Sequence, residues 1–337
     1  MAEQKISIHS ITAPASAVDG DKMAVDFHAG GVIRMSSDTF TTAPTPAVQG
    51  SARGYTSGGF TGTVTTNVID DFPFASDTNA SDVGDLSSAK MYNAGQSSAS
   101  HGYNSGGFDP TGARNVIDKF PFSSDTNASD IGDLTQARYG SSGQFSPTSG
   151  YASGGIQPAV SNIIDKFPFS SDTNATDVGD QQDNRTYAAG QSSTSHGYIS
   201  GGFDPGAPGQ VTTIGKFPFS SDTNESDVGD LTQSRNGVAG QSSASHGYTS
   251  GGNSPPYVNT IDKFPFSSDT NATDVGELSR ISYYGTGQSS TTDGYTSGGN
   301  APPQSNVIDK FPFSSDTNAT DVGDLTQARM YGSGQQV

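Results

Sequence analysis

Hydrophobic and polar residues follow the same order six times along this chain. Each copy carries an aromatic–glycine phrase such as Tyr103-Asn-Ser-Gly-Gly107 and, after it, a run such as Val116-Ile-Asp-Lys-Phe-Pro-Phe122. The Phe-Pro-Phe motifs recur every 47 to 50 residues. A period of this size is typical of propeller blades and solenoid repeats, whose units bury their apolar faces against one another.

Each repeat unit contains four short stretches that favour extended backbone. Short apolar runs are bounded by Gly, Ser, Thr and Asn, which is the pattern of strands joined by tight turns. Apolar residues show no 3.6-residue period, and Gly and Pro interrupt every candidate helix. Four strands per unit is the number in a propeller blade. In one representative unit the predicted strands are residues 137–144, 150–155, 162–169 and 175–178.

The two ends of the repeat region complement each other. The last copy stops after Gln335, just before the next Tyr-x-Ser-Gly-Gly phrase is due, whereas the first copy begins at Gly54 without the segment that precedes this phrase elsewhere. We therefore expect the C-terminal segment to supply the strand that the first unit lacks, which closes the ring and removes free sheet edges. The predicted fold is all-β, a six-bladed propeller of four-stranded blades over residues 50–337.

Residues 1–49 lie outside the repeats and are predicted to form an N-terminal β arm and linker. Lys5–Ile11 alternates as a half-buried strand does, and Met23–Phe27 and Val32–Met35 predict two further strands. Thr41–Pro46 is an extended linker, because Pro fixes its own φ and restricts its predecessor. We expect this arm to pack on the ring or on a partner protein.

Composition and charge exclude several classes of function. The formal net charge is −18, which disfavours binding to nucleic acid or to an anionic membrane through a basic surface. No window is long and apolar enough for a transmembrane span, and the first twenty residues lack the apolar core of an ordinary signal peptide. The absence of Cys excludes disulfides, thiol catalysis and Cys-ligated zinc.

An acidic turn recurs in every unit and is the strongest candidate for a metal site. In the second unit it contains Asp125, Asn127, Asp130 and Asp133. Alternating oxygen ligands suit Ca²⁺, but the glycine is not where an EF-hand loop has it and no Glu closes the loop. We favour turns held by Asx hydrogen bonds, and expect no metal or other cofactor.

Acidic and basic residues also recur in register within the repeats. An Asp lies in most of the Val-Ile-Asp strands, and a Lys or Arg ends most of the Leu-x-x-x-Arg phrases, so the two series could form ion pairs between blades. Gly215 replaces the Asp in one unit, and Ser282 replaces the basic residue in another. The two series are Asp70, Asp118, Asp165, Asp262 and Asp309, and Lys90, Arg138, Arg185, Arg235 and Arg329.

Two sets of aromatic residues are expected to differ in role. Phe72, Phe74, Tyr55 and their copies are predicted to pack between blades as core. The segments after the Gly-Gly pairs vary while their flanks do not, and variable loops on a repeated scaffold are where binding specificity resides. The candidate binding residues in these segments are Phe108, Asp109, Phe203, Asp204 and Tyr257.

The order of these motifs resembles the kelch repeat. The resemblance covers all six units and rests, in the second, on Gly106-Gly107, Phe122, Thr126-Asn127, Ile131-Gly-Asp-Leu134 and Arg138. Kelch repeats usually carry a Trp after the Thr-Asn turn, where this chain has Ala128-Ser129. The resemblance implies a six-bladed propeller that acts as a binding scaffold. Galactose oxidase, an enzyme of that type, needs a Cys–Tyr cross-link, which a chain without Cys cannot form.

The near-identity of the copies and the Gly-, Ser-, Thr- and Asn-rich, Cys-free composition also resemble proteins of phage tails and fibres. This resemblance implies a structural or adhesion component of a virion that is a homo-oligomer or part of a larger assembly. Its arm would dock on other virion proteins, and its propeller would face outward toward a host glycan or protein. The alternative is a stand-alone kelch-like module, extracellular or cytoplasmic, that binds protein or carbohydrate. We expect no catalysis, because no nucleophile triad, phosphate loop or acid pair emerges.

Overall fold

The computed structural model describes residues 26–27, 33–34, 49–206, 209–300 and 302–337. The chain divides into two compact units, residues 1–47 and 48–337. In the first, β1 (Asp26–Phe27) pairs antiparallel with β2 (Ile33–Arg34), within two of the predicted strands. The predicted strand Lys5–Ile11 and the linker Thr41–Pro46 lie outside the described residues.

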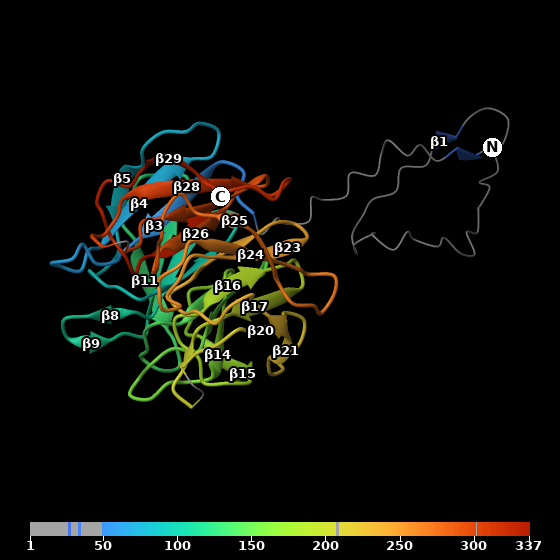
Figure 1. Cartoon of the computed structure of the whole chain (residues 1–337). Helices are drawn as coiled ribbons and strands as arrows, with labels where there is room; N and C mark the ends of the chain where they lie inside the picture. Colours follow the sequence, from blue (N-terminus) through green and yellow to red (C-terminus); the bar gives the residue numbers. More distant parts are fainter. Residues whose placement is uncertain (1–25, 28–32, 35–48, 207–208, 301) are drawn as a thin grey trace. The chain divides into compact units, whose positions relative to one another are not determined.

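The second unit is a six-bladed β-propeller, as predicted (Figure 1). Each blade is a four-stranded antiparallel sheet, and each innermost strand contacts the innermost strands of both neighbouring blades. From the axis outward, blade 1 contains β30 (Ser333–Gln336), β3 (Arg53–Ser57), β4 (Val68–Pro73) and β5 (Ser81–Asp85). Blade 2 contains β6 (Ala94–Ser97), β7 (His101–Ser105), β10 (Val116–Pro121) and β11 (Ser129–Asp133). Blade 3 contains β12 (Ser142–Phe145), β13 (Ser149–Ser153), β14 (Ile163–Pro168) and β15 (Thr176–Asp180).

The remaining blades repeat this order. Blade 4 contains β16 (Ala189–Ser192), β17 (His196–Ser200), β20 (Thr213–Pro218) and β21 (Ser226–Asp230). Blade 5 contains β22 (Ala239–Ser242), β23 (His246–Ser250), β24 (Thr260–Pro265) and β25 (Thr273–Glu277). Blade 6 contains β26 (Thr286–Ser289), β27 (Asp293–Ser297), β28 (Val307–Pro312) and β29 (Thr320–Asp324). Two variable loops form small hairpins, β8 (Phe108–Asp109) with β9 (Gly112–Ala113) and β18 (Phe203–Asp204) with β19 (Gly209–Gln210).

The C-terminal strand closes the ring, as the sequence predicted. β30 pairs with β3 in a register that runs from Gly54 opposite Gln336 to Ser57 opposite Ser333. Figure 1 shows this C-terminal end beside β3 and β4, the first strands of the propeller. One predicted boundary was wrong: the first strand of blade 3 begins at Ser142 rather than 137. Arg138 is instead buried between blades, and Gly140 turns the chain with a φ of 71°.

The core lies between the blades and contains the predicted Phe and Tyr residues, packed with Ile, Leu and Ala. The buried Tyr55 ring lies 5.7 Å from Phe120 and 4.8 Å from Phe122, both in the next blade. The neighbouring Gly54 leaves room for the Phe72 ring of its own blade, which a side chain at position 54 would overlap. Edge-to-face and offset aromatic contacts of this kind add to the stabilisation that burial supplies.

A Gly-Gln pair in each innermost strand packs the blades at the axis. A methyl group on Gly143 would overlap the carbonyl oxygen of Gly95, and the same holds around the ring. The next residue reaches the other way, since Gln96 donates from Nε2 to the Tyr151 carbonyl oxygen at 2.9 Å. Glycine permits the close approach, and glutamine ties each inner strand to the second strand of the following blade.

The propeller has two different ends. One end, called the loop end below, carries the variable loops and the segments that connect successive blades; the other, called the hairpin end, carries the two turns within each blade. No helix of the described residues is long and apolar enough to cross a membrane.

Candidate functional site

Six residues close the loop end of the propeller around its axis. One comes from the segment that leads into each blade, and each donates its backbone N–H to the carbonyl oxygen of the one before it, at 2.6 to 3.0 Å. The result is a continuous circle of backbone hydrogen bonds. Its members are Tyr92, Gly140, Tyr187, Gly237, Tyr284 and Tyr331.

The four tyrosines of this circle have an uncommon backbone conformation. Their φ angles lie between 56° and 63°, close to the 71° and 62° of the two glycines. Non-glycine residues rarely adopt positive φ, and such conformations persist where the surrounding structure holds them. Here the hydrogen-bonded circle holds the backbone, so that four phenol rings meet over the axis.

The four rings pack against one another. Tyr331 lies 4.0 Å from Tyr92 and 4.5 Å from Tyr284, and Tyr187 lies 5.3 Å from Tyr92 and 5.5 Å from Tyr284. The two glycines of the circle, Gly140 and Gly237, leave room for these rings. A Cβ on Gly237, for example, would come within 2.8 Å of the Tyr284 ring. Burial is the main cause that raises the pKa of Tyr92, Tyr187 and Tyr284. These phenols are therefore neutral at physiological pH.

Further aromatic rings extend this cluster in two directions across the loop end. On one side Tyr139 lies 5.8 Å from Tyr92, and Phe108 lies 5.1 Å from Tyr139. On the other side Tyr283 lies 5.3 Å from Tyr284 and stacks on Tyr257 at 4.1 Å. We call the whole set the aromatic tract. It contains Phe108, Tyr139, Tyr92, Tyr331, Tyr187, Tyr284, Tyr283 and Tyr257.

Two of the five predicted binding residues form the ends of the aromatic tract. Phe108 stands in the variable loop of blade 2, and Tyr257, 39% exposed, stands in that of blade 5. Phe203 belongs to the loop of blade 4, where its N–H bonds the Thr186 carbonyl oxygen at 2.8 Å.

The two predicted acidic residues shape their own loops. Asp109 is buried, accepts from the Thr111 N–H at 2.8 Å and pairs with Arg114. Asp204 is also buried and accepts from the Gly206 N–H at 2.7 Å. Hydrogen bonds of this kind hold a turn, so these carboxylates position the loops that carry Phe108 and Phe203.

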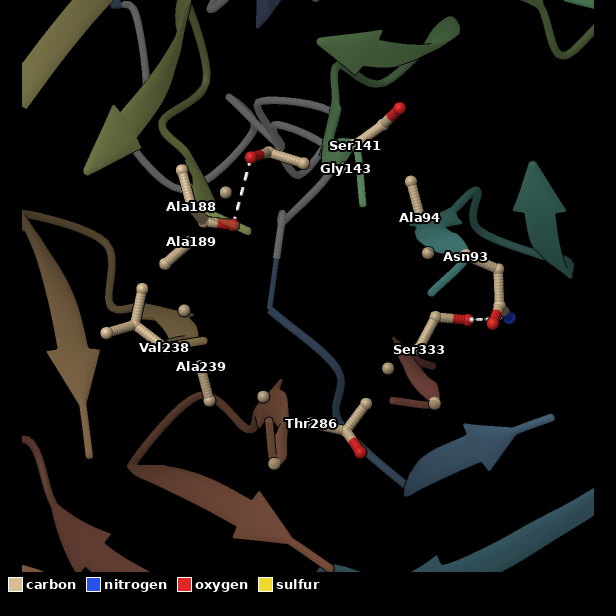
Figure 2. Close-up of a pocket in the computed structure, with 18 of the residues that line it drawn as sticks. Asn93, Ala94, Ser141, Gly143, Ala188, Ala189, Val238, Ala239, Thr286 and Ser333 are labelled. Atoms are coloured by element: carbon tan, nitrogen blue, oxygen red, sulfur yellow. Dashed lines mark hydrogen bonds between the residues drawn. The ribbon is translucent and has the colours of Figure 1, made fainter. Parts of the chain in front are cut away.

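A small chamber lies on the axis among the inner strands. Its volume is about 140 Å³, and its wall consists mainly of backbone and small side chains, including Ala94, Ala189, Ala239, Thr286 and Ser333 (Figure 2). The tyrosines line one end of this chamber, and Phe145 lines it near the other end. None of the described residues that line it is charged. The chamber suits water or a small neutral molecule rather than an ionic ligand.

The acidic turns serve the contact between blades. Asn127 accepts from the Asp85 N–H of the preceding blade at 3.1 Å, and Asp130 accepts from the Gly132 N–H at 3.1 Å. In the described part of the chain, no three His, Asp or Glu residues are grouped so that they could hold a metal ion. The structure thus does not bring Asp125, Asn127, Asp130 and Asp133 together as ligands.

The recurrent basic and acidic residues form buried ion pairs. Each pair joins a connecting segment to the blade that follows it. Arg138 is within 3.0 Å of Asp165 and also donates to the Ala152 carbonyl oxygen at 2.8 Å. Corresponding pairs are Lys90–Asp118, Arg235–Asp262 and Arg329–Asp70, at 2.8 to 3.0 Å. The last pair links the final connecting segment to blade 1, so it supports the closure of the ring.

Two blades depart from this scheme. In blade 4, where Gly215 replaces the Asp, Arg185 pairs instead with Glu225 from the following turn. In blade 6, where Ser282 replaces the Arg, Asp309 is 2% exposed and forms no ion pair with any residue that the structure describes. Arg280, which lies two residues before Ser282, donates to the Gly298 carbonyl oxygen at 3.4 Å. The sequence indicated both gaps but not the compensation by Glu225.

The central tyrosines were not among the predicted site residues. A signal was nevertheless present in the sequence. Two positions after the residue that ends the Leu-x-x-x-Arg phrase, four copies carry a Tyr, as in Lys90-Met-Tyr92, and the other two carry a Gly. A position restricted to Tyr and Gly indicates a backbone conformation with positive φ.

The chain matches no protein-family model, and the curated proteins contain no match to it.

Proposed function

We propose that this protein is a non-catalytic binding propeller whose loop end recognises a saccharide through the aromatic tract. The observation that carries the proposal is the continuous tract from Phe108 to Tyr257 on the end where the loops vary. Tyrosine offers a rigid, amphipathic contact surface at low entropic cost. The electron-rich face of an aromatic ring attracts the polarised C–H groups of a sugar.

The surroundings of the tract agree with a neutral ligand. Burial raises the pKa of Tyr92, Tyr187 and Tyr284, so these three phenols are uncharged, and Asp109, the acidic candidate in the same loop as Phe108, is already neutralised by Arg114. A sugar can therefore contact the rings without facing an unpaired buried charge, which would be costly to desolvate.

We further propose the setting that the phage resemblance implies. In it the protein is a surface or fibre component of a virion, residues 1–49 attach it to other virion proteins, and the ligand is a glycan of the host surface. Its support is the composition and the duplicated sequence. The alternative setting is a stand-alone extracellular or cytoplasmic module, and the same loop end would bind its ligand there.

A glycan array probed with the full chain tests the binding proposal. We expect specific spots for the wild type, and loss of these spots for the double variant Phe108→Ala, Tyr257→Ala. Light scattering of the full chain separates the two settings, since an assembly component is expected to be multimeric and a stand-alone module monomeric. An array without any specific signal would contradict saccharide recognition in either setting.

A further inference from the structure

Tyr92 and Tyr331 are the most closely approaching pair of aromatic rings in the described structure. Their centroids are 4.0 Å apart, with 33° between the ring planes. The backbones are joined as well, because the Tyr92 N–H donates to the Tyr331 carbonyl oxygen at 2.7 Å. Burial raises the pKa of Tyr92, and a hydrogen bond with the Tyr331 side chain raises it further. The two residues are therefore in contact through both their rings and their backbones.

This pair lies at the closure of the ring. Tyr331 comes two residues before β30, the C-terminal strand that completes blade 1, and Tyr92 comes two residues before β6 of blade 2. Hydrogen bonds and packing hold β30 in place. A covalent bond between the two rings would fix the last strand of the propeller to its first connecting segment.

The side-chain chemistry of the chain favours oxidation at tyrosine. The sequence has neither Cys nor Trp, so tyrosine is its most readily oxidised aromatic side chain. When two neighbouring phenols each lose one electron and one proton, the resulting radicals can couple through the ring carbons beside the hydroxyl groups. With centroids 4.0 Å apart, the rings of Tyr92 and Tyr331 are already in contact before oxidation.

We propose that Tyr92 and Tyr331 are a site of oxidative cross-linking, which produces a dityrosine that locks the propeller closed. The oxidant is a peroxide acting with a peroxidase. One new C–C bond replaces two ring C–H bonds, both phenols are regenerated, and the chain loses two hydrogen atoms. The two electrons and two protons reduce one hydrogen peroxide to two waters.

One other pair is a competing site within the same protein. Tyr257 and Tyr283 stack at 4.1 Å with 8° between their planes, and Tyr257 is the more exposed. A bond there would join a variable loop to the nearby connecting segment and would leave β30 free. A bond between Tyr92 and Tyr331 would instead enclose most of the propeller in a covalent loop. Such a loop restricts the unfolded chain, so the cross-linked protein should unfold at a higher temperature.

The test treats the full-length protein with a haem peroxidase and limiting hydrogen peroxide. We expect a monomer lighter by two hydrogen atoms, dityrosine fluorescence, and a cross-linked peptide that contains residues 92 and 331. Its unfolding temperature should exceed that of the untreated protein. Tyr139→Phe should behave as the wild type, because Tyr139 approaches Tyr92 only to 5.8 Å.

Tyr331→Phe keeps the ring but removes the hydroxyl, and should form no such cross-link while it retains the untreated protein's melting temperature within a few degrees. Three results would overturn the proposal: a cross-link that maps to Tyr257 and Tyr283, cross-links only between chains, or no dityrosine at all.

Discussion

The Glu225 carboxylate occupies the space that a side chain at position 215 would require, and there it meets the buried guanidinium of Arg185. In blade 3 the corresponding positions hold Asp165 and Ala175, and Asp165 pairs with Arg138. Blade 4 thus keeps its ion pair through two exchanges, in which the strand loses a carboxylate and the following turn gains one. Blade 4 therefore retains the ion pair that joins its connecting segment to the blade.

This relationship predicts what happens when the carboxylate is moved from position 225 back to position 215. Glu225→Ala leaves the buried Arg185 guanidinium with carbonyl partners but without its carboxylate, and should lower the free energy of unfolding by about 3–5 kcal/mol. Adding Gly215→Asp to Glu225→Ala recreates the arrangement of the other blades and should recover most of that loss. Denaturant unfolding of the two variants and the wild type measures both effects. The interpretation fails if the double variant is no more stable than Glu225→Ala.

Blade 6 predicts the opposite response to the loss of a carboxylate. Asp309 is buried and has no ion pair among the described residues, so Asp309→Asn should leave the free energy of unfolding at pH 7 unchanged or raise it. Asp165→Asn should lower it by about 3 kcal/mol or more, because Arg138 then loses its partner. Equal losses for the two variants would show that Asp309 is neutralised in solution.

The pH dependence of stability gives a second readout at Asp309. Burial raises the pKa of this carboxyl in the folded chain above its ordinary value, which the unfolded chain retains. At a pH between these two pKa values the folded chain therefore binds a proton more tightly than the unfolded chain. Its contribution to stability is therefore present in acid and is lost as the pH rises through the folded pKa. Thermal unfolding between pH 4 and pH 7 should show a smaller decline with pH in Asp309→Asn than in the wild type, and the same slope for both would contradict this assignment.

The glycines of the inner strands predict a steric limit at the axis. Gly143→Ala would drive a methyl group into the Gly95 carbonyl oxygen, and the nearest atoms are all Gly95 backbone, so no side chain can move aside to relieve the overlap. We expect a loss of at least about 1–3 kcal/mol, as for an overpacked core. Ala189→Ser is the matched control, because Ser142 occupies the same position in blade 3. Thermal unfolding distinguishes the two, and an unaffected Gly143→Ala would mean that the inner strands can separate.

The repeat made the architecture predictable. The period defined six blades, the unmatched ends predicted the closing strand, and the fixed spacing of Tyr55 and Phe72 placed both in the core. These features depend on positions that recur in every copy, so the same sequence pattern indicates them six times.

The features that escaped prediction depend on single copies or on the conformation of connecting segments. The Glu225 side chain fills the space beside Gly215, which lies on β20. Only the strand register of blade 4 shows that these two residues are neighbours. Tyr92 and its counterparts lie outside strands, where no hydrophobic period indicates a role. Asp109 has a typical loop composition, which does not reveal that its carboxylate faces its own backbone.

The loop end as a saccharide-binding surface is tested most directly by titration calorimetry of the full chain with the glycan that the array selects. Phe108→Ala and Tyr257→Ala remove the two ends of the aromatic tract, whereas Lys310→Ala removes an exposed ion pair with Asp77 at the hairpin end. We expect each loop-end variant to weaken binding about tenfold, which corresponds to about 1.4 kcal/mol, and Lys310→Ala to bind as the wild type. Unchanged affinity in both loop-end variants, or loss of binding in Lys310→Ala, would contradict saccharide binding at the loop end.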